Sequence, residues 1–296
     1  MILIVVTCSP HRCHVDLVRR LTYTERLDVM GVTTLNDKIF VIYRKLPFIV
    51  VYMTQEPYTR LPNISICGLK NPSDIAASSS CIYVSDPYSE AIWRVKATDS
   101  KVDQWLSGVR AVSVSVTSEE KLVLLVGVDI QGSMEEHNVT WWCDIRVYSE
   151  GAVNEMIINL SRGITSPFSV VVTSRKTFVI SYGCPCHEMN GVCEVDRNGQ
   201  MLKAFGSSPG EGVGQLNMPC DVSLDDEEQI IVADSNNNRV LLLNKELSLL
   251  QVLVRWHPQS LSEDARWSTR LHYDSHSGRL LVGLLNGQLD IYQLHS

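Results

Sequence analysis

Residues 206–250 read GSSPGEGVGQLNMPCDVSLDDEEQIIVADSNNNRVLLLNKELSLL. Four short apolar runs, at 222–224, 230–233, 240–243 and 249–254, are separated by turn residues and leave no room for a helix. They predict one four-stranded antiparallel unit of about 40–50 residues, the size of a propeller blade. Such a unit cannot bury both of its faces alone, so its repetition along the chain decides the fold.

The unit recurs six times. The apolar run of the second strand, which often closes on Asp, is found again at 39–42, 82–86, 122–126, 178–181, 231–234 and 280–282. A first strand precedes each of these runs, at 30–33, 72–76, 112–115, 167–171, 219–222 and 268–271. Regularly spaced short strands with turn residues between them are typical of radial repeats. The sequence therefore predicts an all-β fold, a six-bladed β-propeller.

The last copy is one strand short. Nothing after the run 289–294 can supply a fourth strand, whereas the run 15–23 precedes the first complete copy. We predict that 15–23 forms the outer strand of the last blade, which closes the ring and removes an open sheet edge. Residues 15–296 then form a single propeller, and 1–14 are expected to be a poorly ordered lead-in.

Composition restricts the function classes. The net charge of −7 argues against nonspecific nucleic-acid binding, which needs a basic face. Apolar runs are too short for a membrane helix, and 1–6 is too short for a secretion signal. We therefore expect a cytoplasmic protein without membrane contact. The nine cysteines are expected to be reduced, because a ring of this size needs no disulfides.

The blade at 206–250 resembles NHL repeats. The resemblance rests on the glycines at 206, 210, 212 and 214, on Pro219, and on the runs 231–234 and 236–240. It is weaker at 73–95 and weakest at 112–159, where the Pro and Asp residues are missing. The full set is similar to the six-bladed NHL propeller of tripartite-motif and related ubiquitin ligases. That resemblance implies a docking platform for protein or RNA, although no zinc-binding RING, B-box or coiled-coil pattern is present in this sequence.

One face of the predicted ring carries the candidate binding residues. The loops between second and third strands share this face with the links between blades, and both surround the channel mouth. Exposed aromatic and Arg side chains supply much of the binding energy at interfaces. For Asp234, the Asn run and Arg239, stabilisation of their own turn is the alternative role. The candidates are Arg44, Lys45, Asp86, Tyr88, Arg110, Asp129, Arg162, Asp234, Asn236, Arg239 and Arg266.

Two weak metal candidates are present. Cys184, Cys186, His187 and Cys193 offer soft ligands in one loop, but a single residue between the first two cysteines makes a poor zinc knuckle. Asp74 and Asp221 could look into the channel and hold Ca²⁺, although hydrogen bonds to neighbouring backbone are the alternative. With no matched set of three or four ligands visible, we expect no metal and no cofactor.

An axial zinc enzyme would need His on several inner strands. The matching positions predicted here are Gly31, Asp74, Val114, Ser169 and Asp221, and none is His. No Ser/His/Asp arrangement, phosphate loop or nucleotide fingerprint is present either. The leading hypothesis is a non-catalytic, protein-binding propeller linked to ubiquitin-ligase pathways. A single-stranded RNA binder is the alternative, and a metal-dependent propeller lyase or hydrolase is third.

Overall fold

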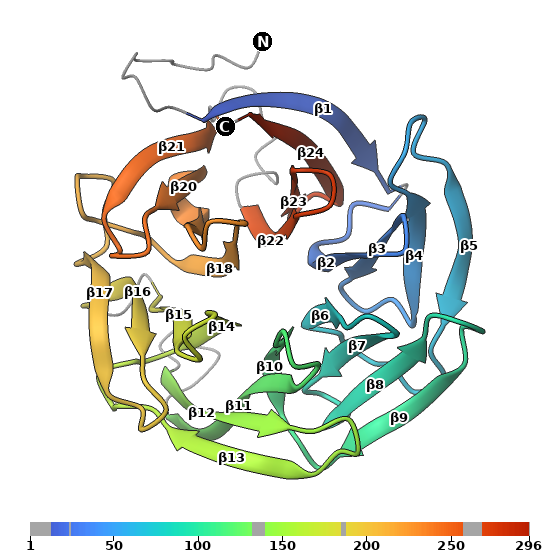
Figure 1. The fold of residues 1–296 in the computed structure, drawn as a ribbon, viewed down its shortest axis with the longest axis horizontal. Coiled ribbons are helices and arrows are strands. Elements are labelled where there is room, and N and C mark those ends of the chain that lie inside the picture. The colour runs from blue at the N-terminus through green and yellow to red at the C-terminus, as the bar shows by residue number, and fades with distance from the viewer. Residues whose placement is uncertain (1–12, 24, 132–139, 185–187, 257–267, 296) are drawn as a thin grey trace.

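The described residues of the computed structural model form a closed ring of six four-stranded sheets (Figure 1). They are residues 13–23, 25–131, 140–184, 188–256 and 268–295. Within them the secondary structure is 24 strands and one 3-10 helix, η2 (Ser235–Asn237). The prediction of an all-β, six-bladed propeller is confirmed.

The first three blades follow one another along the chain, each running from an inner to an outer strand. They comprise β2 (Val29–Leu35), β3 (Lys38–Tyr43), β4 (Phe48–Met53) and β5 (Arg60–Ser65); β6 (Asp74–Ala77), β7 (Cys81–Asp86), β8 (Ala91–Lys96) and β9 (Val102–Ser107); and β10 (Ala111–Val116), β11 (Leu122–Gln131), β12 (Thr140–Tyr148) and β13 (Asn154–Asn159).

Blades 4 and 5 repeat this order, and the sixth differs in its outer strand. They comprise β14 (Pro167–Val172), β15 (Phe178–Tyr182), β16 (Asn190–Val195) and β17 (Met201–Ser207); β18 (Pro219–Leu224), β19 (Ile230–Asp234), β20 (Arg239–Leu243) and β21 (Leu249–Arg255); and β22 (Ser268–Asp274), β23 (Arg279–Leu284), β24 (Gln288–His295) and β1 (His14–Thr22).

The ring closes through the pairing of β1 with β24. The two strands run antiparallel from His14 opposite His295 to Thr22 opposite Gln288. Arg20 on β1 donates through Nε and Nη2 to the two carboxylate oxygens of Asp290 on β24, each at 2.6 Å, and Asp290 is fully buried. The predicted completion of the last blade by an N-terminal strand is therefore confirmed.

The hydrophobic core is divided among the six interfaces between neighbouring blades. Ile42 of blade 1 and Ile82 of blade 2, for example, belong to one buried cluster, and the other five interfaces each hold a cluster of their own. Because burying an Ile or Leu side chain contributes about 1.5–3 kcal/mol, each blade depends on both neighbours for its stability.

The inner strands place six equivalent residues around the channel. On five of the six inner strands the pairing register shifts just before this position. On β10 the shift moves the channel-facing residue one position away from where simple alternation of side chains would put it. The prediction of Val114 at this position is therefore wrong: Ser113, opposite Leu125, is the equivalent residue. The full set is Gly31, Asp74, Ser113, Ser169, Asp221 and Arg270.

Three of these residues accept a hydrogen bond from the next blade. Asp74 Oδ2 accepts from the backbone N–H of Val114 at 2.9 Å, Ser113 Oγ from Val170 at 3.3 Å, and Asp221 Oδ2 from Leu271 at 2.7 Å. In each case the donor is the residue directly after the channel-facing residue of the next blade. These bonds tie the inner strands together where no sheet hydrogen bonds connect them.

Candidate functional site

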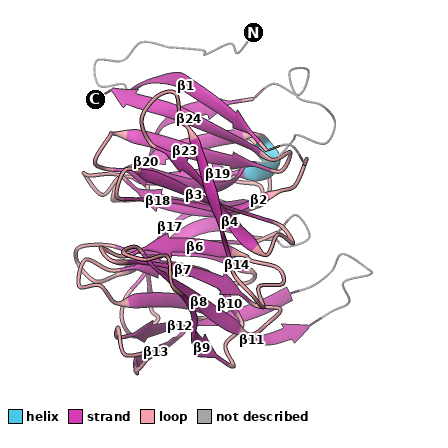
Figure 2. Cartoon of the chain, turned by 90° about the vertical axis from the view of Figure 1, so that its right-hand side faces the viewer, coloured by secondary structure: helices cyan, strands magenta, loops and turns pink. Residues whose placement is uncertain are grey.

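The two flat sides of the ring carry different loops (Figure 2). We call loop face the side formed by the loops between second and third strands together with the links between blades; it includes η2. The opposite face carries the remaining loops and the end of β24. The sequence placed its binding candidates on the loop face, and the described ones lie there.

Two candidate acids on this face are buried inside their own loops. Asp86 has no exposed surface and accepts backbone N–H groups of Lys70 at 2.7 Å and Tyr88 at 3.1 Å. Asp234 is equally buried and accepts the N–H of Asn217 at 2.7 Å. Each carboxylate fastens its loop to the preceding link between blades. The expectation that Asp86 and Asp234 would present charge to a partner needs correction, because neither is accessible.

Arg239 is also a structural residue. Its Nε donates to Asp234 Oδ2 at 2.6 Å, while Nη1 and Nη2 donate to the carbonyl oxygens of Glu211 and Gln215 at 3.1 and 2.9 Å. The side chain is 7 % exposed. Asn236 donates through Nδ2 to Asn217 Oδ1 at 3.1 Å. The turn role considered for these residues is the one that the geometry supports.

Two other candidate arginines, the half-buried Arg44 and the exposed Arg110, form ion pairs. Arg44 Nε lies 2.5 Å from Asp28 Oδ2, and Arg110 Nη2 lies 2.6 Å from Glu90 Oε1. The Arg110 side chain is 62 % exposed and Glu90 44 %. Both pairs join a loop between strands to a link between blades. Arg44 and Arg110 therefore each have an acidic neighbour.

Aromatic and apolar groups also lie on the loop face. Tyr88, two residues from Glu90, is 66 % exposed, and Val213 in the link before β18 is 97 % exposed. Arg162 lies over the ring of Trp142, with its guanidinium carbon 4.5 Å from the ring centre. Val213, in a link between blades, and Trp142, on β12, were missed from the sequence, because a single Val or Trp carries no motif.

Three remaining candidates add little to this description. Lys45 is exposed in the same loop as Arg44. The backbone of Asp129 lies in β11, but its side chain is outside the described residues, as is all of Arg266.

The soft metal candidates do not assemble in the described residues. Cys184 is disulfide-bonded, which corrects the expectation that all cysteines are reduced. Cys193 is a free, fully buried thiol on β16, and burial raises its pKa to about 12, far from the thiolate that a metal needs. Cys186 and His187 lie outside the described residues.

Asp74 and Asp221 do share the channel, with Arg270 close to both. Burial raises the pKa of Asp221 to about 7; the attraction of Arg270 opposes the rise, and the repulsion of Asp74 adds to it. Burial also raises the pKa of Asp74. One oxygen of each carboxylate accepts from a neighbouring blade and the other from the next residue along its own strand. The alternative to Ca²⁺, hydrogen bonding to neighbouring backbone, is what the structure shows.

Arg270 was missed from the sequence and spans the channel. Its Nε donates to the carbonyl of Met30 at 2.7 Å, Nη2 to that of Ser73 at 2.9 Å, and Nη1 to that of Cys220 at 3.4 Å. These carbonyls belong to blades 1, 2 and 5, while Arg270 belongs to blade 6. The guanidinium therefore binds four blades together on the axis.

Comparisons with known proteins support the fold. The family model described as NHL repeat matches residues 216–241, which run from the link before β18 into β20. No curated protein matches the chain. The described part of the chain contains no helix long and apolar enough to cross a membrane.

Solved structures with similar folds have low sequence identity. A protein of unknown function from Bacteroides thetaiotaomicron has a TM-score of 0.67 at 10% identity, covering 96% of this chain and 76% of its own. A catalytically inactive virginiamycin B lyase from Staphylococcus aureus with quinupristin has 0.64 at 9%, covering 96% and 100%. The WD40 propeller domain of Doa1 has 0.63 at 13%, covering 95% and 97%. The chain is thus a six-bladed β-propeller whose fifth blade matches the NHL-repeat model.

Proposed function

We propose that the loop face is a docking platform for a protein partner and that the chain has no chemistry of its own. The main support is that aromatic and charged side chains lie together on this face, around the exposed Tyr88. An aromatic ring lies there beside the ion pair of Glu90 and Arg110, on loops that buried carboxylates hold in place. Rigid aromatic and Arg side chains at an ordered surface are the groups that contribute most at protein interfaces.

The ion pairs favour protein over single-stranded RNA. RNA binding needs several cations in register along a phosphate track, each neutralising one phosphate. Arg44 and Arg110 belong to blade 1 and to the link between blades 2 and 3, and each already contacts a carboxylate. A phosphate would have to compete with Asp28 and Glu90 at these positions, whereas a protein surface can complement both charges of each pair.

The link to ubiquitin-ligase pathways and the cytoplasmic location are part of this proposal. They rest on the resemblance of 206–250 to the NHL propellers of tripartite-motif ligases and on the apolar patterns described above. The likeness to a propeller lyase concerns the fold alone. The channel carboxylates Asp74 and Asp221 are engaged in hydrogen bonds between and within blades, which supports a non-catalytic role.

Site-specific photocrosslinking tests the docking proposal. A photoreactive amino acid at position 88 of the full chain, expressed in cells, should capture a defined protein set. The same group at the exposed Asn198, on the opposite face, should not capture that set. Quantitative mass spectrometry of the two samples measures the difference, and a ubiquitin-ligase subunit among the captured proteins would support the pathway. Identical sets at both positions would contradict the proposal.

An RNA titration distinguishes the alternative function. The full chain is mixed with single-stranded RNA of mixed sequence at low and at moderate salt. We expect weak binding that Arg44→Ala and Arg110→Ala leave almost unchanged. Submicromolar affinity that collapses with salt and weakens in both variants would favour RNA as the ligand.

A further inference from the structure

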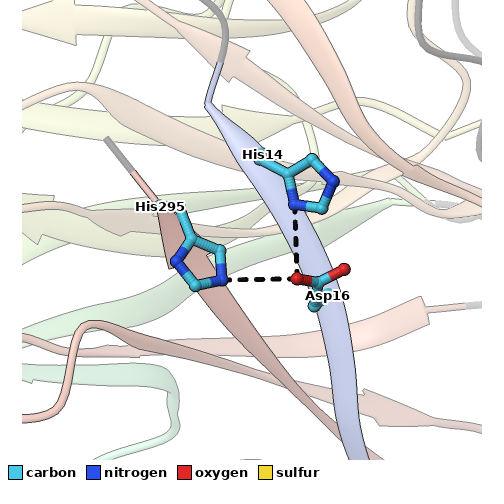
Figure 3. Close-up of side chains that lie close together, drawn as sticks. All are labelled: His14, Asp16 and His295. Carbon is cyan, nitrogen blue, oxygen red and sulfur yellow. Dashed lines mark ion pairs between the residues drawn. The ribbon is translucent and has the colours of Figure 1, made fainter.

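A cluster of two histidines and one aspartate lies where the ring closes. His14 and Asp16 are on β1, and His295 is at the end of β24 (Figure 3). All three side chains are exposed, by 57 %, 55 % and 52 %. They lie at the rim of the opposite face, away from the loop face and its proposed partner.

The strand geometry explains why these residues meet. His14 and Asp16 are two residues apart on β1, and side chains at this spacing point to the same face of a sheet. His295 is directly opposite His14 in the β1–β24 register. Directly opposed residues of an antiparallel pair have neighbouring side chains. Three metal-ligating groups therefore share one face of a rigid two-strand ladder.

The donor atoms are spaced like the ligands of a tetrahedral metal. His14 Nδ1 lies 3.3 Å from Asp16 Oδ2, and His295 Nε2 lies 3.4 Å from the same oxygen. Zinc bonds of about 2.0–2.1 Å at tetrahedral angles put neighbouring donor atoms about 3.3 Å apart. A hydrogen bond between N–H and O is usually 2.7–3.2 Å long, which is about 0.1–0.6 Å shorter. The two distances to Asp16 Oδ2 thus match the spacing of zinc ligands and lie just above the usual range of an N–H···O hydrogen bond, and all three donor atoms lie within 4.8 Å of one another.

The chemistry of the donors selects the ion. Imidazole nitrogens with one carboxylate suit Zn²⁺, whereas Ca²⁺ and Mg²⁺ require more oxygen ligands. The neighbouring Cys13 does not belong to the set, because it packs against the buried cluster between blades 5 and 6 and its thiol contacts the carbonyl of His14. A zinc ion bound here would therefore have three ligands from the described residues and an open fourth position for water.

We propose that His14, Asp16 and His295 form a Zn²⁺ site that fastens the first described strand to the last. No sequence motif could reveal it, because His295 is at the other end of the chain and only the closure of the ring brings it to His14. This site replaces the expectation of no metal that was drawn from the sequence. It would stabilise the ring, because an unfolded chain does not hold the three ligands together.

Zinc titration of the purified full chain tests this proposal. The protein is stripped with a chelator, kept reduced, and titrated against a chromogenic zinc indicator. We expect one strongly bound Zn²⁺ per chain, and Co²⁺ in its place should give the absorption of a tetrahedral site. At about 100 times the dissociation constant, Zn²⁺ should raise the melting temperature by about 5 °C.

Variants assign the ion to its ligands. His295→Ala, His14→Ala and the isosteric Asp16→Asn should each weaken Zn²⁺ binding more than the 10–100-fold that loss of an outer-shell partner costs, and should abolish the zinc-dependent rise in melting temperature. His276→Ala, an exposed histidine in a loop of the same blade, is the matched control and should bind like wild type. Absence of zinc binding in wild type, or unchanged binding in His295→Ala, would overturn the proposal.

Discussion

Replacing Arg270 with alanine removes a cation from the centre of the ring. The variant loses charge-assisted hydrogen bonds to the carbonyls of Met30 and Ser73, at 2.7 and 2.9 Å, and a longer one to Cys220. It also leaves Asp74 and Asp221 without the positive charge that offsets their burial. Removing one partner of a buried charged network costs about 3–5 kcal/mol. We expect the melting temperature to fall by roughly 5–8 °C.

The loss should depend on pH. The pKa of Asp221 is raised in the fold to about 7, from 3.8, so the folded protein binds a proton more tightly than the unfolded chain. The stability that Asp221 contributes is greatest below its pKa of 3.8 in the unfolded chain, and it falls as pH rises from there to the folded pKa of about 7. Without Arg270 the folded pKa rises further, and the penalty of an ionised Asp221 grows. The difference between wild type and Arg270→Ala should therefore be larger at pH 8 than at pH 5.5.

Thermal and urea denaturation followed by circular dichroism at both pH values measure this difference. Arg110→Ala is the matched control, because its exposed ion pair with Glu90 contributes about 0–1 kcal/mol. Arg270→Lys, which keeps the charge but loses the planar fork, should fall between the two. Equal destabilisation at pH 5.5 and 8, or a loss no larger than that of Arg110→Ala, would refute the reasoning.

Three further predictions concern the closure, acid stability and the NHL-repeat blade. Deleting residues 1–23 removes β1 and exposes β24, so the truncated chain should aggregate or melt well below wild type; an unchanged melting curve would contradict the role of β1. Burial lowers the pKa of His272 to about 4 from 6.5, so stability from this group is present above pH 6.5 and lost as pH falls toward 4. Wild type should therefore lose about 2 kcal/mol relative to His272→Gln between pH 6.5 and 4, measured by urea titration. Arg239→Lys should destabilise by about 2 kcal/mol by losing the contacts to Glu211 and Gln215, whereas Arg94→Lys, in a more exposed pair, should cost less than about 1 kcal/mol.

The number of blades and the closure of the ring could be predicted because both follow from local sequence patterns. Short apolar runs between turn residues mark each blade, and the missing strand after 289–294 has one available replacement at 15–23. The channel position on β10 was placed one residue late, at Val114 instead of Ser113, because a register shift changes the alternation that the prediction counted.

The site residues were harder to predict because their roles depend on distant partners. The sequence predicts that Asp86 and Asp234 are exposed loop acids, but each accepts a backbone N–H of the preceding link between blades. Arg270 reads as one charge in an inner strand, and its acceptors lie in three other blades. The pairing of His14 with His295 exists only once the ring has closed. Whether these side chains are exposed, and which groups they contact, depends on the assembled fold and not on a local motif.

The pairing of β1 with β24 also constrains how the protein is made. Almost the whole chain separates the two strands, so during synthesis at about 5–20 residues per second β1 waits on the order of tens of seconds for its partner. Throughout that interval its backbone is an open edge that other chains could pair with. Arg19 and Arg20 are adjacent on β1 and place two positive charges on that edge, which disfavours pairing with other chains. Once β24 is made, Asp290 forms an ion pair with Arg20.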